Sequence, residues 1–221
     1  NVEMICLHHL EQSRSLRILW ALEELQLDYE VKFYQRLSNF AAPAQLKNIH
    51  PLGKAPILTD GEYTIAESAA ILEYLQQYYD VDEQFKPQQP TPALAYRYWM
   101  HYAEGSLMPL LLMTFAMNEA PKKLPKALQH TVDKMLTGVK QNLLSARLKE
   151  HLEYLEDYLT QQAYFAGEFS FADIQMSFGL QAVATRFGAQ YGNIQAYVQR
   201  IEARAAYQRA YAKDQALQQD R

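Results

Sequence analysis

The first third of the chain alternates between short apolar runs and helical periodicity. Residues 3–10, "EMICLHHL", are rich in apolar side chains, which is typical of a buried strand. Residues 13–27 carry leucines three positions apart and predict a helix. Residues 29–35, "YEVKFYQ", alternate apolar and polar side chains and predict a second strand, which completes a βαβ unit.

A hairpin and a helix follow in the pattern. Residues 56–66, "PILTDGEYTIA", read as two short strands joined at Asp60-Gly61, a dipeptide preferred in tight hairpin turns. Residues 67–79, "ESAAILEYLQQYY", have helical spacing. The predicted order of this region is therefore βαβ, a loop or short helix, then ββα.

The pattern then changes to one that is helical throughout. Three prolines and a lack of periodicity identify residues 81–92 as a linker. We predict three parts: an α/β domain over 1–80, this linker, and an all-helical domain over 93–221. Two long helices are expected over 93–117 and 125–161.

Local signals refine the helical part. The first long helix is expected to bend at Gly105 or Pro109. Ser170 lies three residues before Asp173, which is the spacing of a capping box, and Phe169 and Ile174 fall at the positions of a hydrophobic staple. We interpret this segment as a structural helix start. The last helices are expected within "IQAYVQRIEARAAYQRAYAKD".

Composition and charge exclude several classes of protein. A formal charge of −4 over 221 residues argues against a nucleic-acid binder, because phosphate backbones call for clustered basic residues. The longest apolar stretch is too short to span a membrane. A lone Cys6 can form no internal disulfide, and no ligand spacing indicates a metal, so we expect a cytoplasmic protein without metal. Cys6 itself is expected to be a buried apolar side chain rather than a nucleophile.

Four short motifs, in this order, carry a family resemblance: "SRSLR", "NIHPLGKAPIL", "AES" and "FSFADI". Together with the element order they resemble the cytosolic glutathione transferase family over nearly the whole chain. The resemblance implies a thioredoxin-like N-terminal domain (βαβ-ββα) with a helical C-terminal domain. It is closest to bacterial and fungal serine-type, theta-like members, which place a catalytic serine before a helix arginine as Ser13 precedes Arg17 here.

The motif around Pro56 has a physical interpretation as a peptide site. An X-Pro bond reaches the cis form cheaply, and a cis Pro56 would let Ala55 present its backbone to an extended peptide. Ser68 near a helix start favours a carboxylate, and Glu67 can hold an ammonium group. The resemblance implies that the residues that bind glutathione are Lys54, Ala55, Pro56, Glu67, Ser68 and His50.

Each of these residues also has a structural explanation. Pro56 is compatible with the start of an edge strand, Ser68 with a simple helix cap, and Lys54 with a solvated loop charge. The combination of Pro56 with Glu67-Ser68 favours binding.

Ser13 is the predicted catalytic residue. Its hydroxyl would stabilise the glutathione thiolate, aided by the first helix's N-terminus and by Arg14 or Arg17. Ser15 competes for this role, and either serine is compatible with a helix cap. Arg17 is better explained as a structural or interface residue.

The first strand leaves one more alternative. A tyrosine is absent from residues 5–9, which argues against a tyrosine-type enzyme. His8 or His9 would line the site in its place, although histidines at a strand end are usually only packed side chains.

The second substrate is expected between the domains, against the long first helix of the second domain. Glu104 is a candidate for a contact across a dimer interface. The candidates for the wall of an electrophile pocket are Tyr102, Met108, Leu111 and Phe115.

The predicted function is conjugation of the glutathione thiolate to a small hydrophobic electrophile by a homodimer that binds neither nucleic acid nor membrane. Peroxide reduction, dehalogenation or isomerisation with glutathione is the alternative on the same scaffold. A non-catalytic interaction module is the alternative of another class, which the presence of Ser13, Pro56 and Glu67-Ser68 opposes.

Overall fold

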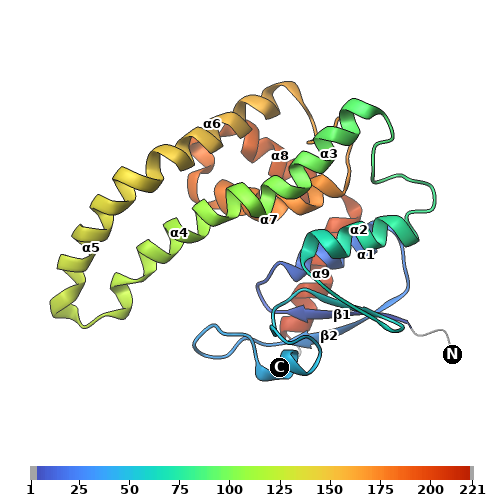
Figure 1. Cartoon of the computed structure of the whole chain (residues 1–221), viewed down its shortest axis with the longest axis horizontal. Coiled ribbons are helices and arrows are strands. Elements are labelled where there is room, and N and C mark those ends of the chain that lie inside the picture. Colours follow the sequence, from blue (N-terminus) through green and yellow to red (C-terminus); the bar gives the residue numbers. More distant parts are fainter. Residues whose placement is uncertain (1–3, 220–221) are drawn as a thin grey trace.

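The computed structural model describes residues 4–219, so residue 3 of the first predicted strand lies outside the described part. Figure 1 shows a small sheet flanked by helices and a larger helical part beside it. The sheet has the order β2-β1-β3-β4. β1 and β2 are parallel, and β3 runs antiparallel to both β1 and β4. The strands are β1 (Ile5–Leu10), β2 (Tyr29–Tyr34), β3 (Ile57–Asp60) and β4 (Tyr63–Ala66).

Two helices complete the N-terminal domain. They are α1 (Ser15–Glu24) and α2 (Ser68–Tyr79), and η1 (Ala44–Asn48) is a short 3-10 helix in the loop before β3. The hairpin turns at Gly61, whose φ of +54° suits a residue without a side chain. The βαβ-ββα order predicted from the sequence is confirmed.

β1 is buried on both faces and alternates between them. Ile5 and Leu7 belong to the main core, while Leu10 joins a smaller cluster with Leu46 and Ile57 on the opposite side. Because successive strand residues point to opposite faces, His9 lies on the same side of the sheet as Leu7. All six residues of β1 are buried, including its two histidines.

The remainder of the chain is helical, as predicted. Within residues 80–219 the α-helices are α3 (Pro90–Tyr102), α4 (Met108–Glu119), α5 (Lys126–Lys140), α6 (Ala146–Gln161), α7 (Phe171–Phe187), α8 (Gly192–Glu202) and α9 (Ala205–Gln219). Shorter segments are η2 (Ala103–Leu107), η3 (Pro121–Lys123), η4 (Gln141–Ser145) and η5 (Gly188–Gln190). Within the described residues, no helix combines the length and apolar character that crossing a membrane requires.

The helix α3 begins three residues before the predicted position. Pro90 and Pro92 occupy its first turn, where a missing backbone N–H costs no hydrogen bond. The sequence pattern assigned these two prolines to the linker, but they belong to the first turn of the helix. The expected bend is a π-helical turn, η2, which contains Gly105 and joins α3 to α4.

One core extends through both parts of the chain. Trp20 of α1 packs against Phe169 before α7 and against Tyr207 of α9, with ring centroids 5.7 and 5.1 Å apart. The helix α9 returns to the sheet, and Figure 1 shows it beside α1 and β1. The C-terminal helix is thus part of the surroundings of β1.

The predicted capping box is present at the start of α7. The Asp173 carboxylate accepts the Ser170 backbone N–H at 2.9 Å, and it also accepts hydrogen bonds from the Phe165 backbone and the Tyr197 hydroxyl. Burial raises the pKa of Asp173 to about 6, although these donors oppose the shift. The segment has the structural role that the sequence indicated.

Candidate active site

A cavity of about 310 Å³ lies between the N-terminal domain and α4, and we call it the first cavity. It brings together every residue that the sequence assigned to glutathione binding. Arg14, Glu104 and Leu112 complete one side of it. The predicted residues that line it are His50, Lys54, Ala55, Pro56, Glu67 and Ser68.

The loop before β3 has the geometry that a peptide edge requires. The Ala55–Pro56 bond is cis. Gly53 has a φ of +56°, and a side chain there would meet the Cγ of Lys47 at 2.7 Å. Only glycine fits this position, which explains the glycine in "PLGKAP".

The helix α2 begins at the wall of the first cavity. Glu67 has a φ of +72°, an unfavourable conformation for a residue with a side chain, and its side chain is exposed. Such strain is concentrated at functional sites. Ser68 is buried, and it is the first residue of the helix, where backbone N–H groups lack helical partners. An exposed carboxylate and a buried hydroxyl therefore lie next to each other at a helix start.

A buried arginine forms hydrogen bonds to this wall of the first cavity. Arg17 donates to the Ser68 hydroxyl at 2.9 Å, to Glu104 at 2.7 Å and to the Gln175 carbonyl at 2.6 Å. Burial lowers the pKa of Arg17 to about 10, with Glu104 opposing the shift. Because Arg17 occupies one lone pair of Ser68, the hydroxyl hydrogen of Ser68 is directed elsewhere. The structural role expected for Arg17 agrees with this geometry.

Glu104 joins the two arginines near the cavity. The π-helical turn η2 positions it, and it accepts hydrogen bonds from Arg14 and from Arg17. Burial raises the pKa of Glu104, but Arg14 and Arg17 outweigh this effect and lower the pKa below its ordinary value. Both carboxylate oxygens are held within the same chain, and the predicted contact across a dimer interface stays a prediction.

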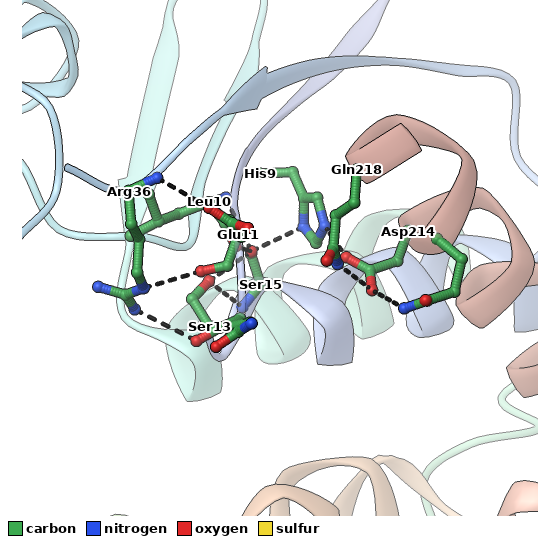
Figure 2. Close-up of polar contacts among 10 residues, drawn as sticks. His9, Leu10, Glu11, Ser13, Ser15, Arg36, Asp214 and Gln218 are labelled. Atoms are coloured by element: carbon green, nitrogen blue, oxygen red, sulfur yellow. Dashed lines mark hydrogen bonds and ion pairs between the residues drawn. The ribbon is translucent and has the colours of Figure 1, made fainter. Parts of the chain in front are cut away.

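The loop from β1 to α1 separates the two candidate serines. Ser13 lies at the edge of the protein interior with 9% of its surface exposed, whereas Ser15 is fully buried. The two hydroxyl oxygens are 2.7 Å apart, and Ser13 Oγ also accepts the Ser15 backbone N–H. Arg36 donates to the backbone carbonyls of Glu11 and Gln12 in this loop, and Figure 2 shows the contact with Glu11. Ser13 is the serine that a bound molecule can reach.

A second cavity, of about 400 Å³, opens beside Ser13. Its far wall is one face of α7, where the lining residues recur at helical spacing. The side chains that line it are Gln12, Ser13, Leu16, Phe178, Gln181, Ala182, Thr185, Arg186 and Asp214. Arg14, which lines the first cavity, lies 5.1 Å from the ring centre of Phe178 in the second, so the two cavities are neighbours.

The structure packs most of the predicted wall of the electrophile pocket into the core, and the pocket's position stays a prediction. Tyr102, Met108 and Leu111 are at most 6% exposed and belong to the core. Phe115 is exposed, but it is not among the residues that line either cavity. Three of the four predicted side chains therefore pack inward, and α7 supplies the far wall of the second cavity.

Both histidines of β1 are buried, as the packed alternative described. His8 bonds to the Tyr34 hydroxyl at 3.0 Å, and burial lowers its pKa, with Lys32 adding to the effect. His9 bonds to Ser15 and to Asp214 of α9. No local pattern in the sequence indicates the partnership of His9 with Asp214, which lies 205 residues away. Cys6 is buried as expected, and burial raises its pKa.

Sequence profiles of two protein domains match the chain. Residues 2–77 match the N-terminal domain of glutathione S-transferases, and residues 106–205 match the C-terminal domain. Glutathione S-transferase 3 of Schizosaccharomyces pombe is 39% identical over 92% of this chain and 85% of its own length. Glutathione S-transferase 1 of Saccharomyces cerevisiae is 31% identical over 98% of both chains.

Solved structures agree with this match. A glutathione S-transferase from Actinobacillus pleuropneumoniae superposes with a TM-score of 0.79 at 34% identity, over 99% of this chain and 97% of its own. A glutathione transferase from Phanerochaete chrysosporium, solved with oxidized glutathione, has a TM-score of 0.76 at 16% identity over 100% and 99% of the two chains, and supports the fold. The chain therefore belongs to the glutathione S-transferase family and is an enzyme of that family.

Proposed function

We propose that this protein conjugates glutathione, as co-substrate, to hydrophobic electrophiles, with the peptide bound in the first cavity. The observation that supports the proposal is the convergence of six predicted binding residues, from His50 to Ser68, on one cavity. The lining of this cavity includes the first residue of α2 and the cis Ala55–Pro56 peptide bond.

Each part of the tripeptide has a chemical partner in the first cavity. The γ-glutamyl carboxylate lies at Ser68 and the helix start, where free N–H groups favour an anion. Its ammonium group pairs with Glu67. The cysteinyl backbone pairs with Ala55 in the manner of an added strand. Lys54 and His50 bind the glycine carboxylate.

The thiol extends from this peptide toward Ser13. A free thiol of pKa about 8.5 is largely protonated at neutral pH, so the protein must favour the anion. Lowering that pKa by about two units takes roughly 2.7 kcal/mol, which one charge-assisted hydrogen bond and a helix end can supply. The electrophile occupies the second cavity, beside Ser13.

We extend the proposal to assembly and location. A homodimer is typical of the family. A location in the cytoplasm agrees with the free thiol of Cys6, because cytosolic thiols stay reduced. Size-exclusion chromatography with light scattering is expected to give twice the mass of the chain.

A substrate panel tests the proposed function. The protein is expected to bind a glutathione matrix, to be released by free glutathione, and to turn over an aryl halide faster than a hydroperoxide or a disulfide. Faster turnover of a hydroperoxide would replace conjugation by peroxide reduction. A protein that fails to bind at millimolar glutathione would contradict both reactions.

A further inference from the structure

Four side chains form an unbroken line that starts at Ser13 in the second cavity, passes through buried Ser15 and His9, and ends at Asp214, which also borders that cavity. Ser13 Oγ is 2.7 Å from Ser15 Oγ, and Ser15 Oγ is 2.7 Å from His9 Nδ1. On the other side of the ring, His9 Nε2 is 2.7 Å from Asp214. Figure 2 shows the line, which runs from the loop after β1 through the imidazole to α9. Conjugation as proposed above uses Ser13 alone and leaves the other three without a role.

The line passes through the buried His9 ring and ends at the Asp214 carboxylate. His9 is fully buried, and among residues 4–219 its contacts come from Ser15 of α1, the Phe33 ring of β2 and Asp214, of which Asp214 is the titratable group. Burial raises the pKa of Asp214, but its hydrogen bonds, first that to His9 and then those from Gln218 and Gln215, lower it below the ordinary value. An ionised carboxylate therefore faces Nε2 and stabilises an imidazolium.

Counting hydrogens shows that the line has two complete arrangements. Two backbone N–H groups fix the oxygens in either one: Leu10 donates to Ser15 Oγ and Ser15 donates to Ser13 Oγ, each at 3.1 Å. When His9 is neutral, Ser13 donates to Ser15, Ser15 donates to Nδ1, and Ser13 has one lone pair left for the cavity. When His9 is charged, Nδ1 donates to Ser15, Ser15 donates to Ser13, and Ser13 has its hydrogen left for the cavity.

The two arrangements match the two states of a thiol. A thiol can donate to the free lone pair of Ser13, and a thiolate can accept the free hydrogen of Ser13. The longer contact of Ser15 Oγ with the Leu10 carbonyl, at 3.3 Å, is an alternative that neither arrangement uses. Switching between the arrangements moves one proton from the cavity to His9 while every heavy atom stays in place.

We infer that Ser13, Ser15, His9 and Asp214 form a proton relay, in which His9 takes up the proton of bound glutathione's thiol and Asp214 holds the resulting imidazolium. The inference rests on the proposed function, and it identifies His9 as the base that takes up the thiol proton. His9 acts through the two serines and Asp214 acts through His9, so both are positioning residues.

The proton transfers balance. The thiol gives its proton to Ser13 Oγ and keeps the electron pair on sulfur, the Ser13 proton passes to Ser15 Oγ, and the Ser15 proton passes to His9 Nδ1. The thiolate then faces a donating hydroxyl. After sulfur has bonded to an aryl halide and halide has left, the imidazolium proton returns by the reverse transfers to water that replaces the product.

Proton counting tests the relay in the unmodified enzyme. Glutathione is added in weakly buffered solution at neutral pH, the thiolate is measured by its ultraviolet absorbance, and released protons are measured with a pH indicator. Calorimetry reports binding separately. Thiolate is expected to form with far less than one proton released per thiolate. One proton released per thiolate, or binding without thiolate, overturns the relay alone, whereas an absence of binding overturns the proposed function and the relay with it.

Two variants sharpen the result. Asp214→Asn keeps the shape of the side chain but removes its charge, and the pKa of the bound thiol is expected to rise by about 1 to 3 pH units with little change in glutathione affinity. His9→Asn keeps a polar atom near Nδ1 that takes up no proton, and is expected to release one proton per thiolate formed. An unchanged thiol pKa in the first variant, or an unchanged proton count in the second, overturns the relay.

Glu23→Gln is the matched control. Glu23 lies on α1 and accepts hydrogen bonds from Arg209 and Lys213 of α9, so the variant weakens the docking of the same helix without touching the relay. The thiol pKa and the proton count are expected to match the unmodified enzyme. A shift equal to that of Asp214→Asn would assign the effect to helix docking and overturn the relay.

Discussion

The two cavities differ in how their residues are distributed along the chain. The predicted part of the first cavity comes from residues 50–68, a single stretch with a glycine, a cis-proline and a helix start. The second cavity combines the β1–α1 loop with α7 and α9, so its residues lie up to 202 positions apart, from Gln12 to Asp214. Binding groups set by local backbone geometry leave a sequence motif, whereas groups brought together by helix packing do not.

The largest expected effect tests the support of the first cavity. Arg17→Met leaves the buried Ser68 hydroxyl and the Gln175 carbonyl without their donor. Breaking a buried ion pair typically costs about 3 to 5 kcal/mol of unfolding free energy. Urea unfolding measures this cost. Arg14→Met, which removes a partly exposed partner of the same Glu104, is the control and is expected to cost about 1 kcal/mol or less. Equal losses would contradict the buried support.

The next prediction compares how two buried carboxylates, one outside the cavities and one at the second cavity, change the free energy of unfolding with pH. The pKa of Asp173 is raised from 3.8 to about 6, so its contribution to stability is present below pH 3.8 and is lost as pH rises to about 6, by about 3 kcal/mol. The pKa of Asp214, at the second cavity, is lowered, so its contribution is present above pH 3.8 and is lost as pH falls. The free energy of unfolding of each variant is measured across pH 3 to 7. Asp173→Asn is expected to abolish a fall in stability with rising pH, and Asp214→Asn is expected to abolish a rise. Slopes of the same sign would be inconsistent with these pKa shifts.

Two serine variants separate binding from chemistry. Ser68→Ala removes a hydroxyl that bonds to a substrate carboxylate and is expected to weaken glutathione binding by about 1.5 to 3 kcal/mol with little change in fold. Calorimetry measures the affinity. If stability fell and affinity did not, Ser68 would be a helix cap and nothing more.

Ser13→Ala is expected to give the complementary result. Turnover at neutral pH falls because the bound thiol has a higher pKa, while glutathione affinity changes little, since the γ-glutamyl end is held in the first cavity. The loss shrinks as pH rises and the thiol ionises unaided. The pH–rate profile with an aryl halide at saturating glutathione measures it, and a loss that is independent of pH would argue against a role in ionisation.

The smallest expected effect concerns the second cavity. Thr185→Val changes one polar group of the α7 wall to an apolar group of similar size. The change in KM for an apolar electrophile is expected to correspond to about 1 kcal/mol or less of binding free energy, and glutathione affinity is expected to stay unchanged. KM values for two electrophiles of different polarity measure the change. A change in glutathione affinity instead would mean that the two cavities do not divide the substrates in this way.

Local patterns in the sequence determined much of this protein. The periods of the first eighty residues fixed the order of strands and helices, because side-chain periodicity reports directly on a strand or a helix. Pro56 and the Ser170–Asp173 box act through their own backbone neighbourhood, so their local structure could be predicted without the fold. Ser13 was preferred to Ser15 on spacing, and the exposure of the two side chains agrees with that choice.

Tertiary structure alone decided which faces of the helices meet. Tyr102, Met108 and Leu111 have a pattern that suits a pocket wall as well as a core, and packing assigns them to the core. His9 and Asp214 become partners because α9 returns across the molecule to β1, an approach that depends on the packing of all the helices between them. The sequence supplies the groups of the relay, but their alignment depends on long-range contacts, which side-chain periodicity does not encode.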